Sequence, residues 1–262
     1  MKRVLITFGG AKYDKTVKEI VEHAPKMGAD SVWVYDEQWL MQTEFYRLNH
    51  WLWEGRGICK DRGFGWWCWK PFVILDALDR LEIGDVVLFI DADTFPIHDF
   101  SMLYDECARA GGAMLFEAQG WIQHRVCKRD CFIVMGQDEE RYHNAQAAVA
   151  RFMLFQKGPW KPHQFLMEWL TYNVNPLAIT YDPSVIGRPE MPELWEHRAE
   201  QSILTNLSVK YGYRLYREAC QFGDNSTLDR DLYPTLFHQI GADKDDPSLA
   251  GSAYRNMPTR TQ

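Results

Sequence analysis

Residues 85–93 read Asp85-Val86-Val87-Leu88-Phe89-Ile90-Asp91-Ala92-Asp93, and their pattern is the strongest indication of the fold class. Its apolar run is continuous and does not alternate with polar residues, which is typical of an interior strand of a parallel sheet covered on both faces. Two carboxylates follow where the strand ends. An Asp-x-Asp pair in that position can converge on one divalent cation, because hard oxygen ligands select Mg²⁺ or Mn²⁺ rather than zinc.

The N-terminal segments complete the pattern of a parallel sheet. Val4 to Phe8 is a short apolar run closed by Gly9-Gly10, Tyr13 to His23 has helical spacing, and Ser31 to Tyr35 is a second apolar run. A strand, a glycine turn, a helix and a strand normally build a parallel sheet. The ligand crevice of such a sheet lies at the carboxyl ends of its strands.

The next segment leads into the Asp-x-Asp strand. Residues 36–69 are irregular and rich in tryptophan. Lys70-Pro71 then opens a helix, because proline is tolerated at the first helical position, and an apolar stripe continues to Leu81. We expect Gly84 to end this helix.

The second half of the chain also alternates strands and helices. We expect strands at Ala113 to Glu117, Cys131 to Met135 and Ala148 to Phe155. A helix is expected at about residues 162–174. Another is expected from His197 to Tyr211, ending at Gly212 as a suitable C-terminal cap.

Composition limits the classes of protein that this chain can belong to. It has 262 residues, with 29 Lys and Arg against 36 Asp and Glu, a net charge of −7 that argues against binding nucleic acid. No apolar run is long enough to span a bilayer, and the N-terminus reads as a strand rather than a signal peptide. The six scattered cysteines have no Cys-x-x-Cys pair, which favours reduced thiols. We therefore expect a cytoplasmic protein.

The run from Trp69 to Pro96 resembles the nucleotide-sugar glycosyltransferases of the GT-A fold. It is most similar to the group of glycogenin and the bacterial lipopolysaccharide galactosyltransferases (glycosyltransferase family 8-like), and to capsule-type relatives. This resemblance implies a single α/β domain, GT-A-like and therefore Rossmann-like, with a mixed, mostly parallel central sheet flanked by helices. We assign this domain to residues 1–242 and a polar, flexible tail to residues 243–262.

The resemblance also implies a donor site. Lys70 takes the place of a basic residue that contacts the diphosphate or the first Asp of the motif. The segment after the first strand, from which we take Thr7, Phe8, Gly9 and Tyr13, corresponds to the part that binds the nucleotide. Asp91, Ala92 and Asp93 would contact the donor, with Asp91 and Asp93 also holding the metal.

Two C-terminal segments follow in the family's order. The helix from His197 to Asn206 resembles the family's Asp-Gln-Asp-x-x-Asn helix, with Glu200 and Ser202 in place of the two Asp residues. Glu200 and Gln201 are the candidate catalytic residues, because an inverting transferase needs a carboxylate base and a retaining one needs a polar group under the anomeric carbon. His238 resembles the histidine of a His-x-x-Gly motif and is a third candidate metal ligand, although a packed histidine is the equal alternative.

The sequence thus predicts a metal-dependent hexosyltransferase, of the kind found in polysaccharide biosynthesis. It would use Mn²⁺ or Mg²⁺ to move a sugar from a nucleotide diphosphate donor, a UDP-sugar, to a glycan, a lipid-linked acceptor or a protein. We expect no transmembrane segment, and a peripheral membrane contact stays open. We also expect one or two of Trp66, Trp67 and Trp69 near the acceptor cleft. The sugar, the acceptor and the stereochemistry stay open.

Two alternatives belong to other classes. Asp91-Ala92-Asp93-Thr94 also fits a haloacid dehalogenase-type phosphatase, with Asp91 as nucleophile, Asp93 as general acid, and a later metal motif at Asp224 and Asp229. Against it, a complete strand-helix-strand unit precedes the motif, and the segment before Asp224 is a poor strand. A non-catalytic carbohydrate-binding module would suit the tryptophans, but such modules are mostly antiparallel β structures.

Overall fold

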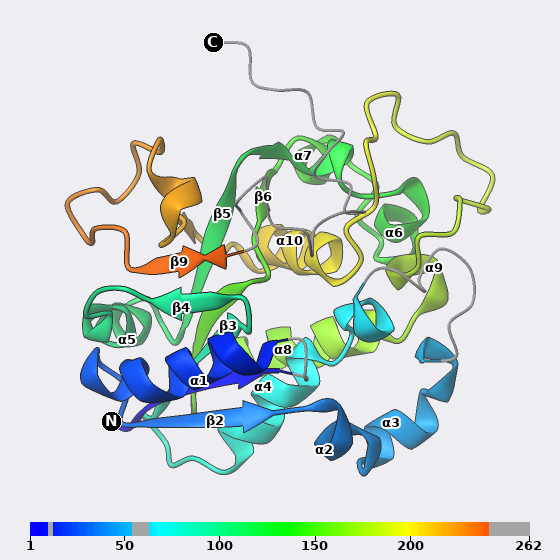
Figure 1. The fold of residues 1–262 in the computed structure, drawn as a ribbon. Coiled ribbons are helices and arrows are strands. Elements are labelled where there is room, and N and C mark those ends of the chain that lie inside the picture. The colour runs from blue at the N-terminus through cyan, green and yellow to red at the C-terminus, as the bar shows by residue number, and fades with distance from the viewer. Residues whose placement is uncertain (10–12, 54–62, 241–262) are drawn as a thin grey trace.

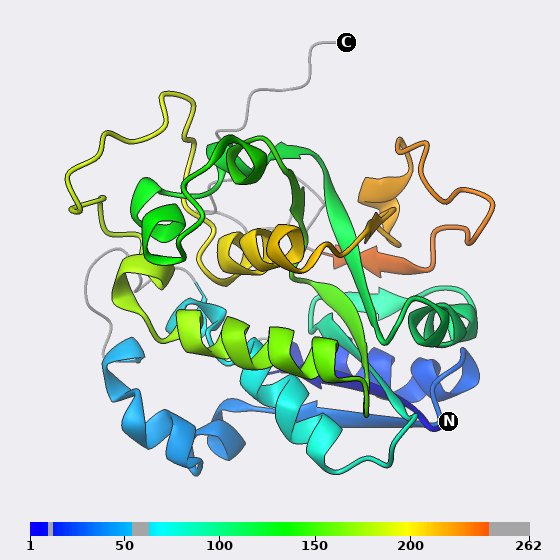
Figure 2. The ribbon, with the colours of Figure 1, turned by 180° about the vertical axis from the view of Figure 1, so that it is seen from behind.

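The computed structural model describes residues 1–9, 13–53 and 63–240. In these residues the chain folds around one seven-stranded sheet with helices on both faces (Figures 1 and 2). The strands of this sheet are β1 (Arg3–Phe8), β2 (Ser31–Tyr35), β3 (Val86–Asp91), β5 (Ala113–Ile122), β6 (Gln146–Ala148), β7 (Phe152–Gln156) and β8 (Leu215–Tyr216). A separate two-stranded sheet pairs β4 (Thr94–Pro96) with β9 (Phe237–Gln239).

The strand order is β2-β1-β3-β7-β5-β6, and β8 also pairs with β5. Strands β1, β2, β3, β5 and β8 run in one direction, whereas β6 and β7 run in the other. The sheet is therefore mixed and mostly parallel, which confirms the predicted fold class.

Helices cover the two faces of this sheet. The α-helices are α1 (Asp14–His23), α2 (Glu37–Met41), α3 (Glu44–Leu48), α4 (Lys70–Asp79), α5 (Ser101–Arg109), α6 (Arg129–Val134), α7 (Glu140–His143), α8 (Trp160–Asn173), α9 (Pro176–Ile179) and α10 (Glu200–Tyr211). Short 3₁₀ helices are η2 (Ala24–Lys26), η3 (His50–Leu52), η5 (Phe64–Trp67), η6 (Gln123–Arg125) and η7 (Gln221–Gly223).

The hydrophobic core has two halves, one on each face of the sheet. In β3, Val87 and Phe89 pack into the half that contains α4, α8 and α10. Val86, Leu88 and Ile90 pack into the half that contains α1 and α5. Both faces of this strand are therefore buried, which explains why its apolar run is continuous.

Three sequence expectations about elements are wrong. The run from Cys131 to Met135 is not a strand but lies in and just after α6, because a short apolar run fits a buried helix as well as a buried strand. Ala148 to Phe155 is not one strand: β6 pairs with β5, whereas β7 pairs with β3 and β5. Residues 36–69 include α2, α3, η3 and η5 within their described part.

Several boundaries also differ from the sequence expectations. Helix α4 ends at Asp79, before Gly84, and α10 begins at Glu200 rather than His197 because Ala199 has a positive φ of 46°. The C-terminal end of α10 is as expected, with Gly212 in the left-handed conformation. The segment before Asp224 does contain a short strand, β8. The predicted tail at residues 243–262 lies outside the described residues.

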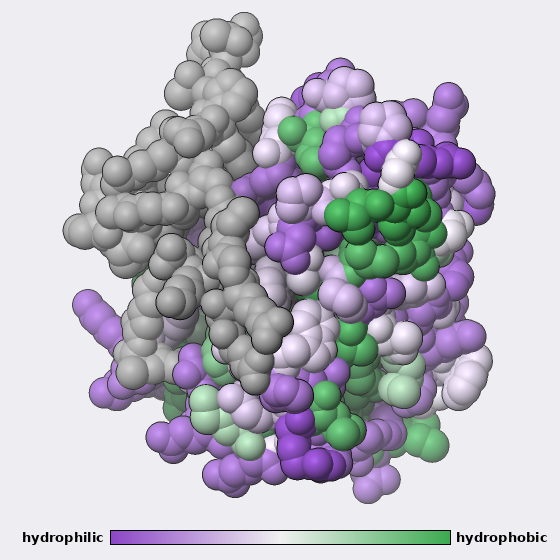
Figure 3. Space-filling model, turned by 90° about the vertical axis from the view of Figure 1, so that its right-hand side faces the viewer, coloured by the Kyte–Doolittle hydropathy of each residue, from purple (hydrophilic) through white to green (hydrophobic). Residues whose placement is uncertain are grey.

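No described helix has the length and apolar character that crossing a membrane requires. The side of the molecule that lies to the right in Figure 1 is mostly hydrophilic, with a few separate hydrophobic patches (Figure 3). The described cysteines Cys68, Cys107, Cys127, Cys131 and Cys220 are all buried, and Cys59 lies outside the described residues.

Candidate active site

The candidate site begins at the carboxyl ends of β1 and β3. These strands are neighbours, and Phe8 lies opposite Asp91. From β1 the chain passes to β2 on one side and later returns to β3 on the other, so the strand order reverses between β1 and β3. In open α/β sheets, ligands bind in the crevice at such a switch point. The predicted segments Thr7–Gly9 and Asp91–Asp93 both lie there.

Lys70, the first residue of α4, is the buried centre of this site. Its Nζ atom lies 3.0 Å from Oδ1 of Asp91 and 3.1 Å from Oε1 of Glu200, and it donates to the carbonyl oxygen of Ala150 at 2.8 Å. The side chains of Lys70 and Glu200 are only 3% and 5% exposed, and that of Asp91 is 28% exposed. One buried cation thus joins the end of β3 to the first turn of α10.

The charges in this cluster shift one another's pKa. Burial lowers the pKa of the Lys70 ammonium, but the carboxylates of Asp91 and Glu200 outweigh it and raise this pKa. Burial raises the pKa of the Asp91 carboxyl, with Lys70 opposing and Asp93 adding to the rise. Burial likewise raises the pKa of Glu200 against the effect of Lys70. The Lys70 side chain therefore stays protonated between the carboxyl groups of Asp91 and Glu200. Burial disfavours the charged form of each of the three groups.

Asp93 belongs to a second chain of contacts. Its Oδ1 accepts a hydrogen bond from Thr94 at 3.2 Å, and its Oδ2 accepts one from Nε2 of Gln239 at 2.9 Å. The other side-chain atom of Gln239, Oε1, accepts from the guanidinium of Arg151. Arg151 also pairs with buried Glu218, at 3.2 Å. These contacts connect the Asp-x-Asp turn to β9 and to the segment after β8.

The residues of these two networks carry two more negative than positive charges. The carboxylates are Asp91, Asp93, Glu200 and Glu218, and the cations are Lys70 and Arg151. A phosphate group alone would meet net repulsion here, whereas a divalent cation would offset the excess.

The carboxylate oxygens of Asp91 and Asp93 are suitable ligands for a hard divalent cation. A carboxylate has more lone pairs than its present partners use, and Mg²⁺-type ions are commonly held by one or two carboxylates plus substrate phosphates. Among the described residues, no three His, Cys, Asp or Glu side chains gather closely enough to form a complete metal site.

His238 lies on β9, where it is paired with Phe95, and its ring packs edge-on against that phenyl ring at 5.6 Å. The adjacent residue, Gln239, is the one whose side chain reaches Asp93. Neighbouring residues in a strand point to opposite faces, so His238 and Gln239 diverge. The role of His238 as a metal ligand stays a prediction, and Gly241 of its motif lies outside the described residues.

Helix α10 presents its first turn to the site. Glu200 reaches Lys70, and the buried side chain of Gln201 makes no hydrogen bond within the described residues. Ser202 instead has a structural role, because its hydroxyl donates to the carbonyl oxygen of Val126 at 2.6 Å and accepts from the Arg198 amide at 3.0 Å. Only the start of this helix is therefore placed for chemistry.

The predicted nucleotide segment is partly described. The Thr7 hydroxyl is buried without a hydrogen-bond partner in the described residues, and Phe8 stacks on Trp69 with ring centres 3.8 Å apart. A Cβ atom on Gly9 would come within 2.5 Å of Val17, so glycine lets α1 pack close to the end of β1. Tyr13 is the N-terminal cap of α1, whereas residues 10–12 lie outside the described part.

The tryptophans before Lys70 are packing residues. Trp66 and Trp69 are 5% and 4% exposed, and Trp69 donates from its indole nitrogen to the carbonyl oxygen of Phe64 at 3.0 Å. Trp67 also packs against the core and is half-buried. The expectation that this group supplies an acceptor platform has no support in the structure.

The phosphatase alternative also has no support. Its later motif would bring Asp224 and Asp229 to Asp91. Instead, Asp224 accepts a hydrogen bond from Thr235, and Asp229 pairs with Arg214. The α/β sheet likewise differs from the antiparallel structure expected of a carbohydrate-binding module.

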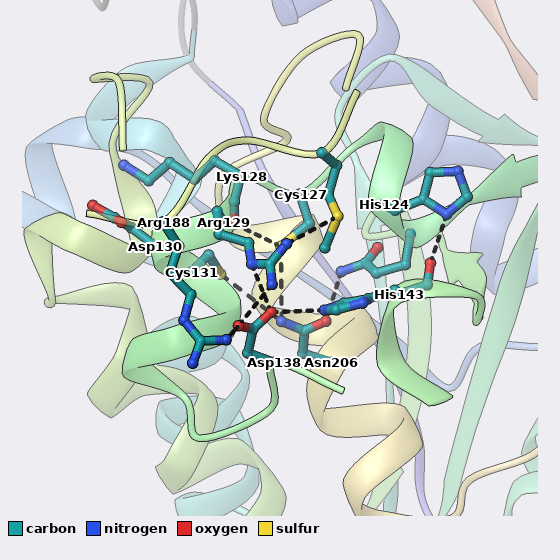
Figure 4. Close-up of polar contacts among 12 residues, drawn as sticks. His124, Cys127, Lys128, Arg129, Asp130, Cys131, Asp138, His143, Arg188 and Asn206 are labelled. Atoms are coloured by element: carbon teal, nitrogen blue, oxygen red, sulfur yellow. Dashed lines mark hydrogen bonds and ion pairs between the residues drawn. The ribbon is translucent and has the colours of Figure 1, made fainter. Parts of the chain in front are cut away.

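A second charged cluster lies beside α10, around Asp138 (Figure 4). The carboxylate of Asp138 pairs with Arg129 at 2.8 Å, with Arg188 at 2.8 Å and with His143 at 2.9 Å. Nearby, the Asp130 carboxylate accepts from the backbone amides of Val185 at 2.6 Å and Ile186 at 3.1 Å. These contacts fasten the long loop that precedes α10 to α6.

Sequence reasoning missed three residues of the site: Arg151, Glu218 and Gln239. Arg151 had a readable signal, because it is a charge inside the apolar run from Ala147 to Phe155. Glu218 and Gln239 had none, since only the pairing of β4 with β9 and the path after β8 bring them to Asp93 and Arg151.

Comparisons with known proteins give only distant likenesses in structure. No model of a known protein family matches the chain. No characterised protein matches its sequence at a significant level. The fold is similar to that of the WbbM bifunctional glycosyltransferase, at a TM-score of 0.48 and 9% identity over 79% of this chain and 37% of that one.

Two further solved structures are similar to this chain. Mouse xyloside xylosyltransferase 1 aligns at a TM-score of 0.43 and 9% identity, over 98% of this chain and 99% of the other. The glycosyltransferase GlyE of Streptococcus pneumoniae aligns at 0.39 and 14% identity, over 82% of this chain and 44% of GlyE. The chain thus spans less than half the length of WbbM and of GlyE.

Proposed function

We propose that this chain is a metal-dependent glycosyltransferase that moves a sugar from a nucleotide diphosphate donor, a UDP-sugar, to a glycan or glycoconjugate acceptor. The observation that carries the proposal is the buried contact of Lys70 with both Asp91 and Glu200 at the switch point of an α/β sheet. Strongly perturbed, buried charges in a ligand crevice are costly, and function is the common reason to keep them.

The donor would lie across the ends of β1 and β3. The segment of Thr7, Phe8 and Gly9 would face the nucleotide, and Tyr13 would be a platform for its base. The unpartnered Thr7 hydroxyl supports this assignment, because a buried polar atom without a partner is costly unless a ligand or water satisfies it. Ala92 lies in the turn between the two carboxylates and is 5% exposed, so its small side chain keeps that turn compact.

Asp91 and Asp93 would hold Mn²⁺ or Mg²⁺, which neutralises a diphosphate and helps it to leave. Lys70 keeps a positive charge beside Asp91, and its bond to Ala150 fixes the position of that charge. Gln239 orients Asp93 by a direct hydrogen bond. These residues fix the leaving-group side of the reaction before the donor arrives, which is the arrangement that makes electrostatic stabilisation effective.

In the transfer, the bond from the anomeric carbon to the diphosphate oxygen breaks, and a bond to the acceptor hydroxyl oxygen forms. The hydroxyl proton needs an acceptor. In an inverting reaction the Glu200 carboxylate would take it, whereas in a retaining reaction a leaving phosphate oxygen would take it while the Gln201 amide lies under the anomeric carbon. Within the described residues the buried side chain of Gln201 has no hydrogen-bond partner, which leaves its amide available for that contact.

Calorimetric titration of UDP into the purified protein tests the proposal, first with Mn²⁺ and then with EDTA, with GDP and CDP as controls. We expect binding of UDP that EDTA removes. If no nucleotide binds in either condition, the assignment of Asp91-Ala92-Asp93 to a donor site is overturned. Turnover of a simple phosphomonoester would then support the phosphatase instead.

A further inference from the structure

A small pocket lies on the loop that leads into α10. It has a volume of about 300 Å³ and is lined by Arg125, Pro192, Glu193, Leu194 and Trp195. Trp195 is 46% exposed, and Trp160, at 72%, is the other tryptophan with a large exposed area. The Trp195 side chain is thus part of a shallow, open depression of the surface.

The pocket is held by several contacts. The Trp195 amide donates to the carbonyl oxygen of Arg125 at 2.8 Å, and the guanidinium of Arg125 lies 5.1 Å from the indole ring centre. The Glu193 carboxylate lies 3.2 Å from Nε of Arg125 and 2.9 Å from Nε2 of His124. The His124 ring also contacts the carbonyl oxygen of His143 at 3.0 Å (Figure 4). The Trp195 indole is thus held in place before a ligand arrives, which lowers the entropy cost of binding.

The chemistry of this pocket suits an uncharged sugar. An aromatic face packs well against the apolar C–H face of a pyranose ring, while a carboxylate and a guanidinium beside it can bond to hydroxyl groups. Glu193 and Arg125 offset each other's charge, so the pocket does not select a phosphate. A nucleotide is therefore the less suitable occupant.

The pocket is also close enough to the candidate active site. Trp195 precedes Glu200 by five residues, and a fully extended chain of that length spans at most about 18 Å. The backbone between them is fixed, because the Arg198 amide donates to the carbonyl oxygen of Val126 at 3.0 Å. An acceptor with several sugar units is long enough to span this distance.

We infer that Trp195, Arg125 and Glu193 form an acceptor subsite, which binds an uncharged sugar unit of a glycan away from the hydroxyl that reacts. The inference rests on the proposed function and makes it more specific, because it makes the acceptor an oligosaccharide rather than a single sugar or a bare lipid or protein side chain.

The test measures binding of short uncharged oligosaccharides, built from hexose and N-acetylhexosamine units, to the full chain and its variants. We expect wild type to bind at least one of them and W195A to bind it about tenfold or more weakly. W195F should recover most of the affinity, since it keeps an aromatic face. The control is W160A, because Trp160 is 72% exposed on α8 and does not line the pocket.

UDP binding with Mn²⁺ is measured on the same samples, and W195A should leave it unchanged. The inference is overturned if no oligosaccharide binds wild type, if W195A binds as tightly as wild type, or if W160A loses as much. Nucleotide binding without oligosaccharide binding would remove the subsite and leave the proposed function. Oligosaccharide binding through Trp195 without nucleotide binding would keep the sugar site and remove the transferase.

Discussion

Two charged clusters of this molecule are built in opposite ways. Around Lys70, one buried cation is shared by the carboxylates of Asp91 and Glu200. Around Asp138, one carboxylate is shared by three basic side chains, those of Arg129, His143 and Arg188 (Figure 4). Both clusters make tertiary contacts between distant segments: Lys70 contacts Glu200, and Asp138 contacts Arg188.

The pKa shifts in the two clusters differ in direction. Burial raises the pKa of the Asp91 and Glu200 carboxyls. Burial also acts to raise the pKa of Asp138, but Arg129 and His143 outweigh it and lower this pKa below its usual value. The Asp138 carboxylate is therefore stabilised in its charged form by its basic partners, whereas the two carboxylates around Lys70 outnumber their cation. This contrast separates the candidate active site from the other ion pairs.

Replacing Asp91 or Asp93 by asparagine should have the largest effect. If the proposed function holds, each variant should lose about 10³-fold or more in metal-dependent hydrolysis or transfer of a UDP-sugar, because a carboxylate ligand of the cation is lost while the side-chain shape is kept. Circular dichroism should show an intact fold. D138N is the matched control and should keep its turnover; full activity in D91N or D93N would contradict the role of the site.

Replacing Lys70 by methionine should be the most destabilising change. It leaves the buried carboxylate of Glu200 and the partly exposed one of Asp91 without their cation, so we expect a loss of about 3 kcal/mol in the free energy of unfolding, measured with urea. The double variant K70M/E200Q should lose less than the two single variants together, because removing one charge relieves the other. Strict additivity would mean that Lys70 and Glu200 are not coupled.

Replacing Asp138 by asparagine should cost about 1.5 kcal/mol in the free energy of unfolding at pH 7, since charged hydrogen bonds to three side chains are weakened. Because the pKa of Asp138 in the folded state is below its usual 3.8, its contribution is present above about pH 4 and is lost as the pH falls through the folded value. The gap between wild type and D138N should therefore close in acid. A gap that stays constant down to pH 3 would show that the carboxylate charge is not the cause.

The smallest effect is expected at β9. Replacing Gln239 by leucine removes the hydrogen bond that orients Asp93, so Mn²⁺-dependent UDP binding should weaken about tenfold. The same titration on H238A tests the predicted ligand on the other side of the strand. If H238A loses as much Mn²⁺-dependent UDP affinity as D93N does in the same titration, His238 is a metal ligand. If H238A keeps its affinity, His238 only packs against Phe95.

The sequence predicted the parts of the fold that rest on local pattern. The continuous apolar run before Asp91 indicates an interior strand because its residues point alternately into two buried halves of the core. Proline after Lys70 and glycine at position 212 mark helix ends because their backbone preferences are local. The short apolar run from Cys131 to Met135 predicts a strand but lies in and just after α6, because a short buried helix and a short buried strand have similar composition.

From the sequence alone we could single out the segments that we propose carry chemistry: Asp91, Asp93, Lys70 and the start of the helix at Glu200. Which of these residues meet is visible only in the folded chain, where Lys70 contacts both Asp91 and Glu200. The contact of Lys70 with Glu200 depends on how α10 packs against the sheet, and the contact of Gln239 with Asp93 depends on the register between β4 and β9. Such contacts join residues that are far apart along the chain. No periodicity or motif spacing records them, because packing and strand register are properties of the whole folded chain.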